Sequence, residues 1–235
     1  MTNYEHATKI PLMIGCGGAE ACVGRSPALV EAIDITPTIL EEAGVVPRTP
    51  SGAASAIACP ATASASRRTD WCTEGRSLSA VLRAPRDAAH SGVNASAPFG
   101  AAFSQFPRPE HPNARVDLMC RDAHLKLCKS AGNPGGNGWC NGTGVCPNKM
   151  GYTVRTHTYR YTAWVAFNKC EGGDCPALLA DWGTVYGVEL YNHSASPVPQ
   201  DYNIETENIA GRPGSAAVEA RLHALVHDFN TRGAA

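Results

Sequence analysis

Residues 152–167 carry the clearest pattern in the chain, an alternation of β-branched or aromatic residues with polar ones. Such an alternation predicts strands that bury one face. The pattern is interrupted near His157 and Thr158, where a turn would join one strand to the next. Two further β-rich runs, 99–106 and 185–191, predict additional strands.

Residues 215–230 repeat apolar side chains at helical spacing, which predicts a final helix. The residues on its apolar face are Val218, Leu222, Leu225, Val226 and Phe229. Strands followed by a covering helix indicate a small antiparallel sheet with one buried face.

The first third of the chain predicts fewer elements. Residues 10–14 are apolar and lead into glycines, which favours a short buried strand that ends in a loop. A helix is expected around 36–43, with Thr36 as its N-cap, Pro37 in its first turn and Gly44 just past its end. Residues 46–68 are rich in Ala, Ser, Thr and Pro, and we interpret them as a surface loop.

Charge and hydropathy narrow the classes of function. The 235 residues include 20 Lys and Arg against 21 Asp and Glu, which leaves a net charge of −1. Nucleic-acid binders and membrane-surface binders need a basic excess, so neither partner is expected. No apolar run approaches the roughly 18 residues of a membrane-spanning helix, and we predict no membrane span.

Ten cysteines are the strongest feature of the composition. None of them forms a Cys-x-x-Cys pair, so disulfides in an oxidising compartment are favoured over a zinc site. Four of them lie in 110–149, which we interpret as a stapled insertion. Short spacing permits local bridges, although the connectivity stays open. The candidates are Cys120 with Cys128, Cys140 with Cys146, and Cys170 with Cys175.

Three Asn-x-Ser/Thr sequons, at Asn94, Asn141 and Asn192, agree with passage through the secretory pathway. A secreted or lysosomal location is therefore expected. The first residues do not have the charged and apolar segments of a signal peptide, so we expect that an N-terminal portion of the protein is missing from this chain.

Several runs of residues share their order and approximate spacing with one enzyme family. They are Tyr-Glu-His-Ala-Thr-Lys-Ile-Pro-Leu at 4–12, Val-Glu-Ala-Ile-Asp-Ile-Thr-Pro-Thr-Ile at 30–39, Glu-Gly-Arg-Ser-Leu at 74–78, Ser-Gln-Phe-Pro-Arg-Pro at 104–109, Met-Gly-Tyr-Thr-Val-Arg-Thr at 150–156, Tyr-Arg-Tyr-Thr-Ala-Trp at 159–164 and Glu-Leu-Tyr at 189–191. Together they resemble the sulfatases, most closely the iduronate-2-sulfatase type. The resemblance covers most of residues 2–210, but the insertion at 110–149 has no counterpart in it.

The resemblance implies a fold similar to that of alkaline phosphatase, with a large α/β domain and a smaller C-terminal domain of antiparallel sheet and helix. Residues 1–95 would then be the tail of the large α/β domain, including a low-complexity loop. Residues 96–235 would be the α+β C-terminal subdomain, with the cysteine-rich insertion at about 110–149. The family also suggests a disulfide between Cys59 and Cys72.

Sulfatases hydrolyse sulfate esters with a formylglycine made from Cys or Ser in a Cys/Ser-x-Pro-x-Arg motif. A calcium ion held by Asp and Asn oxygens neutralises the sulfate. In this chain no cysteine has Pro two positions later, and Ser96, which has one, is followed by Gly100 where Arg should stand. No Asp-Asp pair or Asp-Asn-His run offers metal ligands. The chain is therefore expected to be inactive alone and to hold no cofactor.

The whole protein would combine this chain with its missing N-terminal catalytic portion, bind calcium there and act on a sulfated glycan. The alternative is a non-catalytic secreted module, derived from a sulfatase C-terminal domain, that binds glycans or has a structural role.

Two residues are candidates for the rim of the substrate site, Arg108 and Gln105. An anionic sulfated sugar favours bidentate contact with Arg, but Arg108 could instead pair with an acid beside the strand end. Arg155 and Arg160 are interpreted as solvated charges of a strand pair. Asp34 is expected to make local hydrogen bonds at a helix start.

The histidines offer no clear metal site. His6, His157 and His193 are each expected to be exposed or satisfied by hydrogen bonds rather than to bind a metal.

Overall fold

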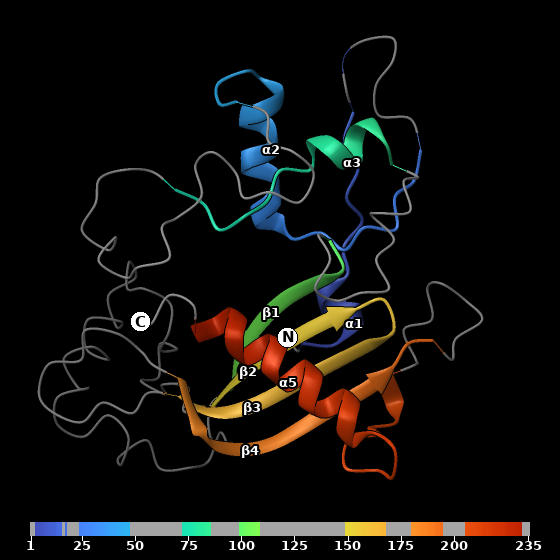
Figure 1. Ribbon diagram of the computed structural model, residues 1–235, viewed down its shortest axis with the longest axis vertical. Coiled ribbons are helices and arrows are strands. Elements are labelled where there is room, and N and C mark those ends of the chain that lie inside the picture. Colours follow the sequence, from blue (N-terminus) through green and yellow to red (C-terminus); the bar gives the residue numbers. More distant parts are fainter. Residues whose placement is uncertain are drawn as a thin grey trace, which may run out of the picture.

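The computed structural model describes residues 3–15, 17, 24–47, 72–85, 99–108, 149–167, 180–194 and 205–231. Within them a four-stranded antiparallel sheet has the order β1-β2-β3-β4 (Figure 1). The strands are β1 (Ala101–Arg108), β2 (Lys149–Thr156), β3 (Tyr159–Phe167) and β4 (Ala180–Asn192). All the strands predicted from residue 99 onward are present, and β4 begins earlier than expected.

One face of the sheet is covered by α5 (Ala216–Thr231). Leu222 and Val226 of this helix are fully buried against strand residues such as Val154 and Leu190. Phe229 stacks on Phe103 of β1, with ring centroids 3.8 Å apart. The predicted apolar face of the helix is therefore confirmed, because Val218 and Leu225 also pack against this core.

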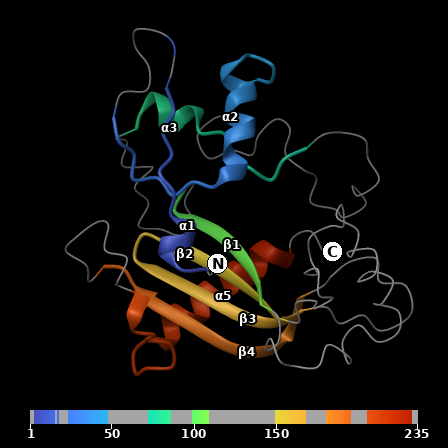
Figure 2. The ribbon, with the colours of Figure 1, turned by 180° about the vertical axis from the view of Figure 1, so that it is seen from behind.

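The N-terminal residues 3–8 pack on the other face of the sheet. Figure 2 shows α1 (Glu5–Thr8) on the side of the sheet away from α5. The Asn3 side chain donates a hydrogen bond to the Gly151 carbonyl of β2, at 3.0 Å. We call this side of the sheet the open face, because α1 is a single short helix and leaves parts of it exposed.

A second group of elements lies beyond the end of the sheet in Figures 1 and 2. It comprises the 3-10 helix η1 (Ala32–Asp34), α2 (Ile35–Glu42) and α3 (Ser79–Arg83). Leu78, Val81 and Phe99 form a small separate core there. Within the described ranges no helix is long and apolar enough to cross a membrane.

Two of the family-like runs meet in this second group. Asp34 is completely buried, and its carboxylate accepts hydrogen bonds from the backbone N–H groups of Glu31 at 2.9 Å and Arg76 at 2.8 Å. The Thr38 hydroxyl accepts another from the Leu78 N–H at 2.8 Å. Gly75 is required at this contact, because a Cβ there would lie 2.1 Å from the Ile33 carbonyl oxygen. The local role predicted for Asp34 is confirmed.

The predicted helix start was wrong by two residues. The helix α2 begins at Ile35, directly after η1, so Thr36 lies inside it and is not its N-cap. A reciprocal capping box between Glu31 and Asp34 opens η1 instead. Gly44 has a φ of +70° just past the helix, which confirms its predicted role at the C-terminal end.

The strand predicted at 10–14 is not formed. Ile10 and Met13 are 71% and 89% exposed, and no neighbouring strand is present in the described residues to pair with this segment. A strand needs a paired neighbour and a covered face, so apolar composition alone did not suffice.

Several predicted covalent features lie outside the described residues. Nearly all of the insertion at 110–149 lies there too, and the register pairs Arg108 with Lys149, the described residues on either side of 109–148. Of the ten cysteines only Cys72 is described, and it is disulfide-bonded. Its pairing with Cys59 stays a prediction. The other features outside are Cys120, Cys128, Cys140, Cys146, Cys170, Cys175, Asn94 and Asn141.

The buried carboxyl group of Glu31 makes the stability of the fold depend on pH. Burial and the neighbouring carboxylates of Asp34 and Glu74 raise its pKa to about 7, against a hydrogen bond from the Phe103 N–H. The folded state therefore favours the neutral carboxyl. Its stabilising contribution is complete below the ordinary value of 4.5 and is lost as the pH rises through 7.

We expect Glu31→Gln to raise the free energy of unfolding by about 1–2 kcal/mol at pH 7.5 and to change it little at pH 5. Urea denaturation at both pH values measures this difference. Glu42→Gln, at a more exposed carboxylate, is the control and should show no such pH dependence. Equal stabilities of wild type and Glu31→Gln at pH 7.5 would contradict the assignment.

Candidate functional site

The open face carries a group of charged side chains that are removed from solvent. They come from five separate places in the chain and are Glu5, Arg155, Arg160, His193 and Glu205. We call this group the charge cluster. Its members lie between residues 3–8 and strands β2 and β3, so the fold of the sheet positions the arginines and α1 positions the first carboxylate.

Arg160 is the centre of the cluster. Its side chain is 1% exposed, and its guanidinium donates to the carboxylates of Glu5 and Glu205. It also donates to the Asn3 carbonyl oxygen and, at 3.1 Å, to the Thr8 hydroxyl. A guanidinium suits this position because its planar fork can satisfy several acceptors at once.

Arg155 completes the contacts of Glu5. Its Nε lies 3.0 Å from Glu5 Oε2, and its Nη2 lies 3.5 Å from Glu5 Oε1. The backbone N–H of Glu5 in turn donates to Glu205 Oε2 at 2.6 Å. Glu205 therefore binds both the first helix and the third strand, and residues 3–8 are held to the sheet by polar contacts.

The ionisation states follow from these contacts. Burial alone would raise the pKa of Glu5, but the hydrogen bond from Arg155 and the charges of Arg155 and Arg160 lower it to about 2. Burial opposes ionisation of Glu205 as well, yet the His193 hydrogen bond and the Arg160 charge lower its pKa. Both carboxylates are therefore ionised at neutral pH.

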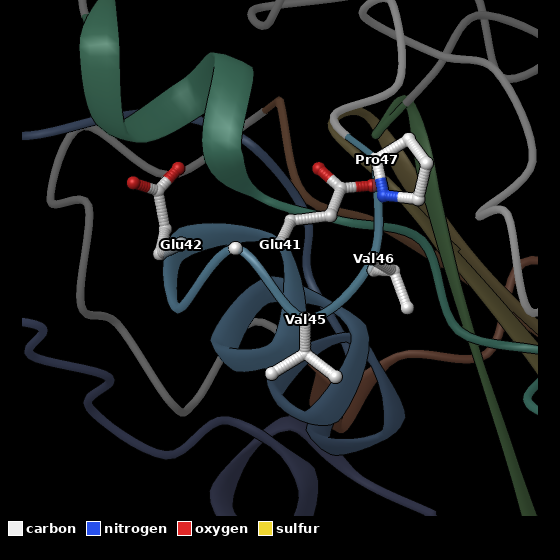
Figure 3. Close-up of a pocket in the computed structure, with 6 residues that line it drawn as sticks. Glu41, Glu42, Val45, Val46 and Pro47 are labelled. Carbon is white, nitrogen blue, oxygen red and sulfur yellow. The ribbon is translucent and has the colours of Figure 1, made fainter.

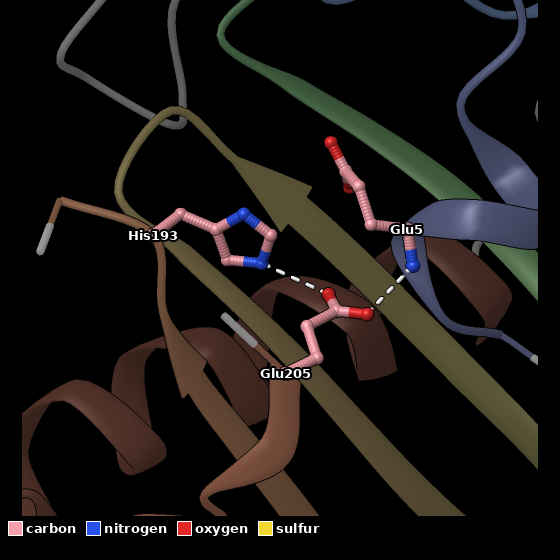
Figure 4. A group of neighbouring side chains, drawn as sticks. All are labelled: Glu5, His193 and Glu205. Atoms are coloured by element: carbon pink, nitrogen blue, oxygen red, sulfur yellow. Dashed lines mark hydrogen bonds and ion pairs between the residues drawn. The ribbon is translucent and has the colours of Figure 1, made fainter. Parts of the chain in front are cut away.

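His193 is buried at the end of β4 and faces Glu205 (Figure 4). Its Nε2 lies 2.9 Å from Glu205 Oε1. Burial lowers the pKa of His193, although the hydrogen bond to Glu205 acts in the opposite direction. The imidazole is therefore neutral at pH 7 and donates its Nε2–H to the carboxylate. This agrees with the expectation that His193 is satisfied by hydrogen bonds.

The charge cluster does not fit a metal ion. Glu5, His193 and Glu205 offer ligand atoms that lie within 4.8 Å of one another. The Arg160 guanidinium already binds both carboxylates, and two arginines balance two carboxylates with a neutral histidine. Calcium also prefers a shell of oxygens, whereas one of the three groups is an imidazole. The cluster contains no nucleophile and serves to hold residues 3–8 on the sheet.

The interpretation of Arg155 and Arg160 as solvated charges was wrong. Both lie on the face that alternation marks as polar, but α1 and Glu205 cover that face and bury Arg160 completely. Sequence reasoning also missed Asn3, Glu5 and Glu205 as members of the cluster. Glu205 had no usable signal, because it lies outside the predicted elements and 45 residues after its partner Arg160.

The two rim candidates are not brought together. Arg108 is exposed on the open face, where its guanidinium lies over the Trp164 ring at 4.7 Å. Gln105 pairs with Tyr152 in the register, on the face covered by α5. Successive residues of a strand point to opposite faces, so the odd spacing separates these two side chains. The alternative role of Arg108, pairing with an acid, is not seen among the described residues.

Asn192, the described sequon asparagine, lies at the end of β4. Its side-chain oxygen accepts hydrogen bonds from the Ser194 N–H at 2.9 Å and from the Ser194 hydroxyl at 2.6 Å. The position is partly exposed, and its glycosylation stays a prediction.

A shallow pocket lies at the C-terminal end of α2 (Figure 3). Its lining residues are Glu41, Glu42, Gly44, Val45, Val46 and Pro47. They all belong to one short segment, so the pocket brings together no groups from different elements and offers no catalytic arrangement.

Comparison with known proteins supports the sequence resemblance. The chain is 30% identical over 238 residues to iduronate 2-sulfatase of Homo sapiens, and 26% identical over 242 residues to iduronate 2-sulfatase of Mus musculus. Each match covers 89% of this chain and 35% of the relative. No model of a protein family matches the chain. The predicted similarity to the iduronate-2-sulfatase type is confirmed, and the chain spans about a third of the length of these relatives.

Proposed function

We propose that this chain forms the C-terminal portion of a sulfatase that hydrolyses sulfate esters on a sulfated glycan. The observation that carries the proposal is the similarity to two iduronate 2-sulfatases over 89% of the chain. The small antiparallel sheet with one covering helix agrees with the C-terminal domain expected from the resemblance.

In this proposal the preceding part of the same protein is an alkaline-phosphatase-like α/β domain. It supplies the formylglycine nucleophile and the calcium ligands, for which this chain has no motif. Calcium would neutralise the sulfate there. In this proposal residues 3–8 belong to the tail of the large domain. The charge cluster holds them on the sheet of the C-terminal subdomain and so attaches one domain to the other.

The same proposal includes disulfides, N-glycans and a location in the secretory pathway, on the basis of the ten cysteines and three sequons. Alone, the chain is expected to be inactive because it carries no nucleophile motif.

Isolation of the native protein tests this proposal. An antibody against the α5 segment, residues 216–231, would recover the protein from its natural source, and antibody blocked with that peptide is the control. We expect a protein much larger than 24.7 kDa that hydrolyses an aryl sulfate with calcium present. The recombinant 235-residue chain should show no such turnover in the same assay.

A native protein of 24.7 kDa without sulfatase activity would overturn the proposal and leave the non-catalytic module as the better account. Turnover by the recombinant chain would instead contradict its expected inactivity.

A further inference from the structure

Two cations stack on aromatic rings side by side on the open face. The Arg108 guanidinium lies 4.7 Å from the centroid of the Trp164 ring, and Lys149 Nζ lies 4.4 Å from that of Tyr186. Arg108 and Lys149 are directly paired residues of β1 and β2. Directly paired residues of an antiparallel sheet share a face and have Cα atoms about 5 Å apart. We call these four residues the cationic patch.

Neither cation of the patch has an acidic partner in the described ranges of the chain. Arg155, Arg160 and Arg83 all form ion pairs, whereas Arg108 and Lys149 form none within the described part of the chain. Stacking on a ring leaves the edge of a guanidinium, with its N–H groups, available to an anion. Among the residues that the structure describes, the patch therefore presents two positive charges without an ion-pair partner, despite the overall charge of −1.

The aromatic platform is held in place. The indole Nε1–H of Trp164 donates to Glu189 Oε1 at 3.0 Å. Its ring lies against Gly151, where a Cβ would come within 2.7 Å of the ring carbons. Tyr186 is 52% exposed and extends the aromatic surface toward solvent. An oriented Arg loses less side-chain entropy when it binds a ligand than a free one would.

We propose that the cationic patch is a binding site for a sulfated polysaccharide. One sulfate contacts the Arg108 fork, a neighbouring anionic group contacts Lys149, and exposed ring surface of Tyr186 packs against the sugar. The planar Arg fork can donate to two oxygens of a tetrahedral sulfate at once, while Lys acts as a compact point charge. The inference rests on the proposed function only for the choice of a sulfated glycan as the ligand.

Calorimetric titration of the full chain with a size-defined heparin oligosaccharide tests the site. We expect binding by wild type, about a tenfold weaker affinity for Arg108→Ala, and a further loss for Arg108→Ala/Lys149→Ala, as expected for lost charge-assisted contacts. Arg212→Ala is the matched control, because Arg212 is an exposed arginine already paired with Glu207 at 2.7 Å. It should bind like wild type.

Affinities for other polyanions distinguish specific recognition of sulfate groups from nonspecific electrostatic attraction. Desulfated heparin and hyaluronan should bind at least tenfold more weakly than heparin; equal affinity for them, or for a single-stranded RNA of matched charge, would overturn the assignment to sulfate. Absence of heparin binding by wild type, or equal affinity of wild type and the double variant, would overturn the site itself. Thermal melting of each variant shows that it is folded.

These outcomes are independent of the test of the proposed function. The titration measures binding by this chain, whereas the isolation measures the size and turnover of the native protein, so either proposal can fail while the other stands.

Discussion

Replacing Arg160 with methionine is expected to lower the free energy of unfolding by about 3–5 kcal/mol, the cost of breaking a buried ion pair by removing one partner. The change leaves the carboxylates of Glu5 and Glu205 buried without their shared guanidinium, and it removes the donor to the Asn3 carbonyl. Urea denaturation at pH 7, followed by tryptophan fluorescence, measures the loss. We expect residues 3–8 to leave the sheet before the rest unfolds.

Arg83→Met is the matched control for this experiment. Arg83 also pairs with a glutamate, Glu42, at 3.2 Å, but its side chain is 45% exposed. Solvent screens such a pair, so the cost should be at most about 1 kcal/mol. Similar losses for Arg83→Met and Arg160→Met would contradict the central role of Arg160.

A double variant distinguishes the lost ion pair from lost packing. Glu205→Gln removes one of the buried charges that Arg160 neutralises. In the background of Arg160→Met it should therefore cost less than it does in wild type, because coupled residues are not additive. Full additivity would indicate that Arg160 acts through its volume alone.

Acidification is expected to destabilise the protein by protonating the carboxylates of the same cluster. The pKa of Glu5 is lowered to about 2, so its contribution to stability is complete above the ordinary value of 4.5 and is lost as the pH falls toward 2. The pKa of Glu205 is lowered in the same direction. For Glu5 alone the loss amounts to about 3 kcal/mol.

His193 adds to this loss at a higher pH. Burial lowers its pKa, so the folded state favours the neutral ring and its contribution begins to fade once the pH falls below the ordinary value of 6.5. Glu31 acts in the opposite sense, since its pKa is raised and its contribution is complete only below 4.5. The acid loss from the cluster should therefore be steepest below pH 4.5, where Glu31 no longer changes.

Denaturation midpoints of wild type and Glu5→Gln between pH 7 and pH 2.5 measure the effect. Glu5→Gln should be less stable at pH 7, and its stability should fall less between pH 4.5 and 2.5. Glu42→Gln, at an exposed carboxylate, should follow the wild-type curve. A wild-type stability that stays constant from pH 5 to pH 2.5 would contradict the ionised, buried state of Glu5.

Much of the C-terminal fold could be predicted because its signals are local. Strands β2 and β3 follow from alternation, and α5 follows from the recurrence that places Leu222 and Val226 on one side. Boundaries were less predictable. A capping box of Glu31 and Asp34 precedes α2, and the buried carboxylate of Asp34 also accepts a hydrogen bond from the distant Arg76 N–H, which no local pattern predicts.

The sequence by itself determined the antiparallel sheet, the helix that covers it, and the similarity to sulfatases, because periodicity and motifs are properties of neighbouring residues. It also marked one face of the sheet as polar. Only the tertiary structure decided what that face does. Whether Arg160 is solvated or buried depends on α1 and Glu205, which lie far from it in sequence, and no pattern within a strand specifies which distant segment will cover it.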